Sequence, residues 1–175
     1  MNNWLPGNPS TAGSNFLRPN KINGEARIRV LELPFAHGYQ RFTKENKPVM
    51  REPGEMFPEA DWKDDAPKPF WACPVWNYTE KKVQVFAFTQ VSIYKELKKY
   101  GEDSDWGAPD GYDLKIRRTG SGMETEYTVV PGNKAPISAE VVAAWTKVKE
   151  EWTGLSALWT SSDPFKPFSE QDLPF

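Results

Sequence analysis

The sequence predicts a mainly β domain with five strands, a helix between the third and fourth strands, and a second helix near the C-terminus. Three observations lead to this fold class. Several short segments alternate apolar and polar residues, short turns join two pairs of these segments, and only two segments repeat apolar residues at helical spacing. The length of 175 residues suits one ordinary domain.

The chain starts with residues 1–20, which are rich in proline, glycine and small polar residues and are predicted to form an irregular arm. The first predicted strand spans Ala26–Leu33, because Ile28 and Val30 alternate with arginines. Gly38–Phe42 either extends this strand or forms a short strand of its own.

A hairpin is predicted in the middle of the chain, after a proline-rich loop over residues 48–69. Its strands are Phe70–Tyr78 and Lys82–Thr89, and its turn is Thr79–Lys81. Pro74 cannot donate a backbone hydrogen bond, so we expect an edge position or a bulge there. Loops as long as 48–69 are usually functional or disordered in compact domains.

The apolar spacing changes to that of a helix over Gln90–Tyr100, and Gly101 is suited to end this helix. A second hairpin follows, with strands Tyr112–Arg118 and Met123–Val130 joined by a turn that contains two glycines. The order of strand, hairpin, helix and hairpin is that of an OB-fold, a small, partly open five-stranded barrel that binds oligonucleotides on one face.

The domain boundaries follow from this order. Residues 21–135 are predicted to form the OB-fold domain. Residues 136–153 are predicted to form a C-terminal helix that packs on the domain, with Ser138 as its N-cap. Residues 154–175 lack periodicity and are predicted to form a flexible acidic tail.

The composition argues against several classes of function. One Cys and one His, Cys73 and His37, allow no intramolecular disulfide and supply too few ligands for zinc or a Ser-His-Asp triad. We expect Cys73 to be a buried, inert thiol and His37 to be a loop residue. No phosphate-binding glycine loop is present, and the carboxylates cluster in loops rather than on rigid elements.

No apolar run is long enough to span a membrane, and the N-terminus lacks the basic and apolar blocks of a signal peptide. We therefore expect a cytoplasmic protein that is not an enzyme and that uses no cofactor and no metal.

The net charge of −2 conceals an uneven distribution. Phe16–Arg51 contains eight basic and three acidic residues, whereas Gly101–Leu158 contains six basic and ten acidic residues. A basic first third with an acidic end is typical of a protein that binds an anion and has a regulatory tail.

Aromatic residues make up 14% of the chain and alternate with bases on the predicted strands. Single-stranded nucleic acid is bound by a basic groove and by aromatic rings that stack on the bases. The predicted stacking residues are Tyr39, Phe42, Trp71, Trp76 and Phe86. The predicted phosphate contacts are Arg27, Arg29, Arg41, Lys82, Lys115 and Arg117. Alternation alone does not decide which of Trp71 and Trp76 faces outward.

The last four residues are Asp172, Leu173, Pro174 and Phe175. They resemble the acidic C-terminal tip of bacterial single-stranded DNA-binding proteins. In such a tip the ring of Phe175 would fill a hydrophobic pocket of a partner, its free carboxylate would pair with a basic residue, and the upstream acids would speed association. The resemblance implies that these four residues recruit a replication or recombination protein.

Short segments across residues 16–145 carry a second resemblance. They are Phe16–Arg18, Asn23–Leu31, Glu45–Val49, Phe70–Ala72, Pro74–Tyr78, Lys82–Val85, Thr89–Gln90, Trp106–Gly107, Gly111–Asp113 and Glu124–Tyr127. The body of the chain thereby resembles the single-stranded DNA-binding proteins of tailed bacteriophages. The resemblance implies an OB-fold that coats and protects single-stranded DNA, without sequence specificity or catalysis, during phage replication, recombination and repair in the bacterial host cytoplasm.

Two alternatives remain open. An RNA-binding OB-fold protein would use the same bases and rings, and would differ in its response to the 2′-hydroxyl of the ligand. A protein–protein interaction module would use the aromatic residues as a peptide or subunit interface, although this function does not require arginine and lysine on the strand faces. A carbohydrate-binding module is the weakest alternative.

Overall fold

Eight strands form one sheet in the part of the chain that the structure describes, residues 15–160 and 163–165 of a computed structural model. The strands are β1 (Phe16–Leu17), β2 (Glu25–Val30), β3 (Ala36–Phe42), β4 (Pro48–Arg51), β5 (Lys68–Asn77), β6 (Lys82–Phe88), β7 (Tyr112–Thr119) and β8 (Glu126–Lys134). The helices are α1 (Val91–Gly101) and α2 (Ala139–Lys149), with short 3-10 helices η1 (Pro19–Lys21), η2 (Pro109–Gly111), η3 (Gly122–Glu124) and η4 (Leu155–Thr160).

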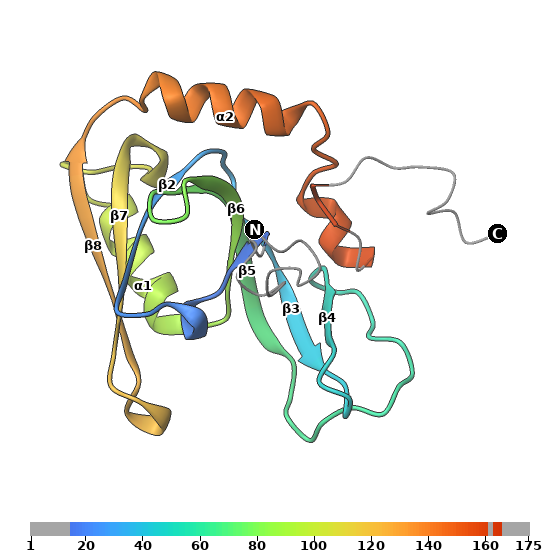
Figure 1. Ribbon diagram of the computed structural model, residues 1–175. Helices are drawn as coiled ribbons and strands as arrows, with labels where there is room; N and C mark the ends of the chain where they lie inside the picture. The colour runs from blue at the N-terminus through green and yellow to red at the C-terminus, as the bar shows by residue number, and fades with distance from the viewer. Residues whose placement is uncertain (1–14, 161–162, 166–175) are drawn as a thin grey trace, which may run out of the picture.

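β2 lies at the centre of the sheet (Figure 1). It pairs antiparallel with β5 on one side and with β7 on the other. β6 pairs with β5, and β8 pairs with β7, so five strands follow the order β6-β5-β2-β7-β8. Helix α1 connects β6 to β7 and contacts β8. The two predicted hairpins and the helix between them are thus confirmed.

The remaining strands extend this arrangement. β3 pairs antiparallel with β4 and with the first half of β5, and these three strands form a wing at the right of Figure 1. β1 pairs parallel with β6. The mainly β class is confirmed, but the sheet has eight strands in the described residues rather than five, and it is open. β1 and β4 fall within the predicted arm and loop, because two and four residues are too short to show alternation.

The main core lies between the concave side of the sheet and α1. Ile28, Leu114 and Ile116 face Ile93 and Leu97 of the helix, and all five are buried. The core also contains Cys73, whose thiol is fully buried; this burial raises its pKa. The expectation of a buried thiol is confirmed.

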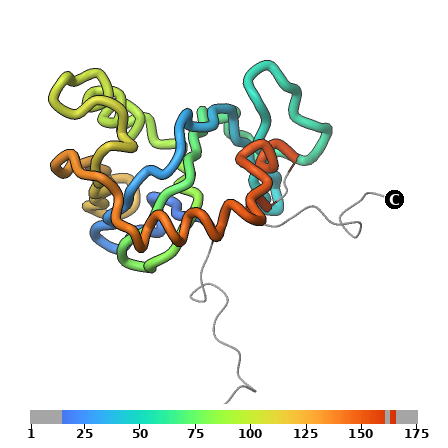
Figure 2. Tube along the Cα trace, turned by 90° about the horizontal axis from the view of Figure 1, so that it is seen from above, coloured from blue at the N-terminus to red at the C-terminus, as the bar shows by residue number. Residues whose placement is uncertain are grey.

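Helix α2 and η4 cover the outer side of β5 and β6. Val141 and Trp145 of α2 pack against Trp76 and Val83, and Leu158 of η4 packs in a cluster with residues of β4, β5 and β6. Figure 2 shows α2 crossing the molecule from the end of β8 toward η4. The predicted N-cap is confirmed, because Ser138 Oγ accepts a hydrogen bond from the Val141 N–H at 3.3 Å.

The first part of the predicted flexible tail, directly after residue 154, is a packed helical segment. Leu155–Thr160 forms η4. Leu158 of this helix is only 3% exposed, because it packs in one cluster with Met50 and Phe70. Residues 161–162 and 166–175 of the predicted tail lie outside the described residues. Within the described part of the chain, no helix combines the length and the apolar character that crossing a membrane requires.

Candidate nucleic-acid interface

Four aromatic rings from β3, β5 and α1 form a row on the surface. His37 is the register partner of Trp71, and their ring centroids are 5.5 Å apart. Tyr39 extends the row with its centroid 5.8 Å from His37, and Tyr94 stacks on Trp71 at 4.6 Å. Tyr39 and Tyr94 are 36% and 37% exposed. We name these four residues the aromatic row.

The local sequence explains why these rings meet. Successive residues of a strand point to opposite sides, so His37 and Tyr39 share one side of β3, and the register places that side level with Trp71. Tyr94 comes from the first turn of α1, whose Ile93 and Leu97 anchor the helix in the core. Contiguous exposed aromatic surface in a protein marks a site of interaction.

An apolar hollow of about 590 Å³ adjoins the end of the row that Trp71 and Tyr94 form. Trp71 and Tyr94 form one part of its lining. Other parts of the lining are Leu33, Phe35, Phe88 and Leu97. Lys98 is the one charged residue among those lining it. The hollow can therefore accept an aromatic or aliphatic group that enters beside the aromatic row.

Arg41 supplies positive charge on the same side of β3 as Tyr39. Its guanidinium lies over the ring of Trp62, 5.0 Å from the centroid, and Trp62 contacts Phe57 edge-on. None of the ion pairs found among the described residues includes Arg41. Its Nε is buried and has no hydrogen-bond partner there. No carboxylate among the described residues therefore competes with an external anion for this half-buried guanidinium.

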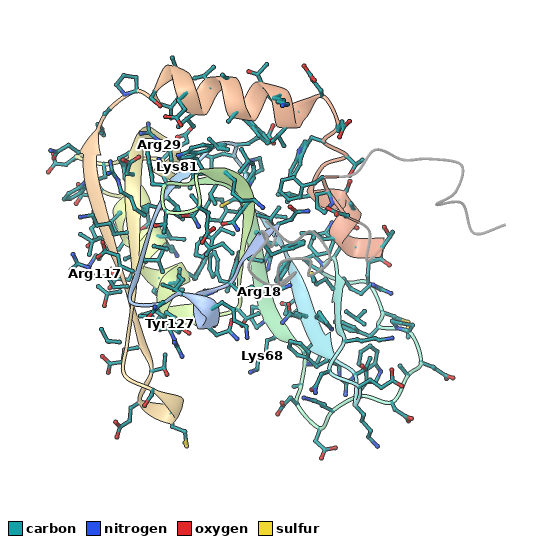
Figure 3. The ribbon with its side chains drawn as sticks, viewed as in Figure 1. Arg18, Arg29, Lys68, Lys81, Arg117 and Tyr127 are labelled. Carbon is teal, nitrogen blue, oxygen red and sulfur yellow. The ribbon has the colours of Figure 1, made fainter. Side chains whose placement is uncertain are left out.

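A second group of bases lies on the outer side of β2 and β7. Arg27 and Lys115 are register partners, and Arg117 follows two residues later on the same side. Arg27 pairs with Asp113 and Arg117 pairs with Glu25, each at 2.6 Å. We name these five residues the charge ladder. Figure 3 labels Arg117 beside β7, on the opposite side of the molecule from the β3–β4 wing.

The acids of the charge ladder compete with phosphate for its arginines. The hydrogen bond from Arg117 lowers the pKa of Glu25, and the hydrogen bond to Asp113 raises the pKa of Arg27. Both shifts stabilise the charged pair. A phosphate would have to displace a carboxylate to reach either arginine, whereas Arg41 has no such competitor in the described residues. The structure therefore favours Arg41 over the ladder arginines as a phosphate contact.

Arg29 is a structural residue, and its prediction as a phosphate contact is corrected. Its side chain is 4% exposed. It donates hydrogen bonds to the carbonyl oxygens of Asp110, at 3.1 Å, and of Ala135, and it pairs with Asp113 at 3.4 Å. The alternating pattern places Arg29 on the outer side of β2, but the segments around Asp110 and Ala135 cover it there.

Two predicted stacking residues are buried and leave the set of stacking candidates. Phe86 is 1% exposed and belongs to the main core. Trp76 is 5% exposed, because α2 covers the side of β5 on which it lies. The sequence places Trp76 and Trp71 on opposite sides of one strand, and the packing of α2 decides that Trp71 is the accessible ring.

The other two predicted residues lie apart from the aromatic row. Phe42 is 38% exposed and occupies the side of β3 opposite to Tyr39, where Lys63 Nζ lies 5.9 Å from its ring centroid. Lys82 is half-buried at the start of β6, opposite Asn77. Of the predicted contacts, the structure thus brings together Tyr39, Trp71 and Arg41.

Sequence reasoning missed two members of the row. His37 was expected in a loop, but it lies in β3, where its Nδ1 is 3.2 Å from the carbonyl oxygen of Phe70. Tyr94 was assigned to a helix without a role. The two-residue spacing of His37 and Tyr39 is a sequence signal that both lie on one side of a strand. The sequence of α1, in contrast, does not indicate that Tyr94 stacks on a strand residue.

No group of three or more His, Cys, Asp or Glu that would suit a metal is found among the residues described. The predicted partner-binding residues Asp172, Leu173, Pro174 and Phe175 lie outside them. Comparison of the chain with protein families, curated proteins and solved structures gives no match.

Proposed function

We propose that the chain binds single-stranded DNA without sequence specificity, and that it coats and protects DNA in phage replication, recombination and repair without acting as an enzyme. The aromatic row carries this proposal. Neighbouring rings of the row contact one another, with centroids 4.6–5.8 Å apart, along a partly exposed surface. Every base has a π-face, so a row of rings binds bases whatever their sequence.

The order of strands supports the same proposal. β2 corresponds to the first strand of an OB-fold, β5 and β6 to the second and third, and β7 and β8 to the fourth and fifth, with α1 between the third and fourth. In OB-folds the face of the second and third strands binds oligonucleotides, together with the loop between the first and second strands and the loop between the fourth and fifth strands. Here the connection from the first to the second strand contains β3, which carries His37, Tyr39 and Arg41.

Two cations near the row support a polyanionic ligand: Arg41, which has no ion-pair partner among the described residues, and Lys98, whose exposed ion pair with Glu102 is long at 4.0 Å. Arg41 lies on the row's side of β3, and Lys98 lines the adjoining hollow. Phosphate neutralisation by such residues releases counterions, which makes binding to single strands depend on salt. In the proposal, Asp172–Phe175 recruit a replication or recombination partner.

The decisive experiment is a titration of the full chain with oligo-dT, followed by tryptophan fluorescence. We expect strong quenching, because Trp71 belongs to the row, and a log–log salt slope of about −0.7 for each phosphate neutralised. Absence of binding at low salt would contradict the proposal. Titration with oligo-rU under the same conditions tests the RNA alternative. The two ligands differ because RNA adds the 2′-hydroxyl and uracil lacks the methyl group of thymine.

The hollow favours one second candidate, a protein-docking function. Its lining is apolar apart from Lys98. An apolar groove of this kind suits an aromatic or aliphatic anchor of a partner peptide. If the chain binds no nucleic acid, this function becomes the better interpretation of the same surface.

A further inference from the structure

A small pocket lies on the other side of the β3–β5 wing, beyond the aromatic row. Its volume is about 170 Å³. Arg18 and Asn20 of the η1 region form one side, Gln40 and Phe42 of β3 form another, and Phe70 lies against it from β5. We name it the Gln40 pocket. It lies at the end of the β5–β6 pair that α2 leaves uncovered, since α2 packs at the Trp76 and Val83 end.

Gln40 brings an unsatisfied polar atom to this pocket. Its side chain is only 6% exposed, and its Oε1 is buried with no hydrogen-bond partner among the described residues. A buried acceptor without a partner costs roughly 1–3 kcal/mol of stability. A ligand that places an N–H in the pocket would remove that cost, so the pocket favours a group that donates a hydrogen bond.

Arg18 and Lys68 bring positive charge to the same region. Arg18 lines the pocket, and Lys68 is the register partner of Gln40. Figure 3 shows both on the side of the molecule where η1 and the start of β5 lie. Neither takes part in an ion pair found among the described residues. Burial lowers the pKa of Arg18, so an anion beside it would offset the cost of its desolvation.

The size of the pocket and its mixture of aromatic and polar lining residues suit a single six-membered ring that carries polar groups. An engineered protein cavity of about 150 Å³ binds benzene, and the Gln40 pocket is of similar size at about 170 Å³. Among the lining residues, Phe42 is 38% exposed and offers ring surface, whereas Phe70 is fully buried. A purine has two fused rings and needs more space than a pyrimidine.

We propose that the Gln40 pocket takes the base of one pyrimidine nucleotide of the bound DNA strand, with Gln40 Oε1 accepting a hydrogen bond from a base N–H and Arg18 pairing with a neighbouring phosphate. Thymine N3–H and the cytosine amino group both supply the required donor. This proposal rests on the proposed function and adds to it a base preference at one position of the strand. Stacking on the aromatic row alone would not create such a preference.

The test compares the affinity of the full chain for dT and dA oligomers of equal length, in the natural protein and in Gln40→Met. Methionine keeps the length of the side chain and removes the acceptor. We expect Gln40→Met to weaken dT binding about fivefold, as loss of one hydrogen bond predicts, and to change dA binding little. The affinity of Gln40→Met is divided by that of the natural protein on each oligomer, so the stacking of adenines within free dA cancels from the comparison.

A matched pair of charge variants tests the role of Arg18. Arg18→Ala and Lys21→Ala remove the same charge from neighbouring positions, but Lys21 does not line the pocket. We expect Arg18→Ala to lower the affinity for dT more than Lys21→Ala does. Equal losses would show that Arg18 contributes only long-range charge, and would contradict the proposed phosphate contact.

Photo-crosslinking of the natural protein keeps the proposal testable even if a variant fails to fold. DNA containing 5-iodouracil should crosslink to the peptide that contains Phe42 or to the peptide that contains Phe70. If DNA binds tightly but neither peptide crosslinks and Gln40→Met weakens dT and dA equally, the pocket holds no base and the proposal is wrong. If DNA does not bind at all, the proposed function itself fails.

Discussion

Trp71 of β5 and Tyr94 of α1 stack with ring centroids 4.6 Å apart and with planes that differ by 13°. This contact joins the sheet to the helix at the rim of the apolar hollow. It also connects a strand residue to a helix residue that lies more than twenty positions later in the chain. The aromatic row is therefore a product of tertiary packing, and its proposed role depends on both elements.

Replacing Tyr94 tests the aromatic row directly. Tyr94 is 37% exposed, so Tyr94→Ala should leave the fold intact while it removes one ring from the row. We expect the affinity for oligo-dT to fall by about 1–3 kcal/mol, the range measured for base–aromatic stacking. Tyr94→Phe keeps the ring and should bind as the natural protein does. Unchanged affinity in Tyr94→Ala would place the bases elsewhere.

A pair of arginine variants decides which basic surface contacts DNA. Arg41→Gln should reduce the magnitude of the log–log salt slope by about 0.7, because it removes one phosphate contact. Arg27→Gln should leave the slope nearly unchanged, because Asp113 already pairs with Arg27 at 2.6 Å. Salt titrations of both variants check this. The reverse result would show that DNA crosses the charge ladder.

Gly38 allows β3 to approach both β4 and η4. A Cβ at this position would contact the carbonyl oxygen of Arg51 and would lie 2.7 Å from the Trp159 ring. We expect Gly38→Ala to lower the free energy of unfolding by about 1–3 kcal/mol, as overpacking does elsewhere. Gly101→Ala is the control, because no atom lies within 4 Å of its Cβ position. Urea unfolding curves of the two variants should differ in midpoint; similar midpoints would contradict the close contact.

Tyr78 makes stability depend on alkaline pH. Burial raises its pKa, and so does the hydrogen bond that its hydroxyl donates to Asp113 at 2.8 Å. The folded state then holds this proton more tightly than the unfolded state. The stabilisation is complete below the ordinary tyrosine pKa of about 10 and is lost as the pH rises through the higher pKa of the folded state.

Tyr78→Phe removes the ionisable hydroxyl, so its free energy of unfolding should decline less above about pH 10. The decline should not vanish, because burial also raises the pKa of Tyr112. Denaturant unfolding at a series of alkaline pH values measures this effect. An identical decline in both proteins would mean that Tyr78 has the same pKa in the folded and unfolded states.

Local patterns in the sequence predict the order of the main elements, although they miss the short strands β1 and β4. The two hairpins, the helix over Gln90–Tyr100 and the Ser138 cap rest on local properties, namely alternation, turn residues and helical spacing, and the structure contains them all. Two members of the aromatic row, Tyr39 and Trp71, were also among the predicted stacking residues.

The accessibility of these residues depends on how the elements pack against one another. Trp71 and Trp76 alternate on one strand, and the packing of α2 buries Trp76 and leaves Trp71 at the surface. Alternation along β2 predicts that Arg29 is exposed, but its guanidinium is buried and donates hydrogen bonds to the carbonyl oxygens of Asp110 and Ala135. Alternation separates the two sides of a strand, whereas long-range packing determines which side another element covers. The packing of β3, β5 and α1 brings His37, Tyr39, Trp71 and Tyr94 together in the aromatic row.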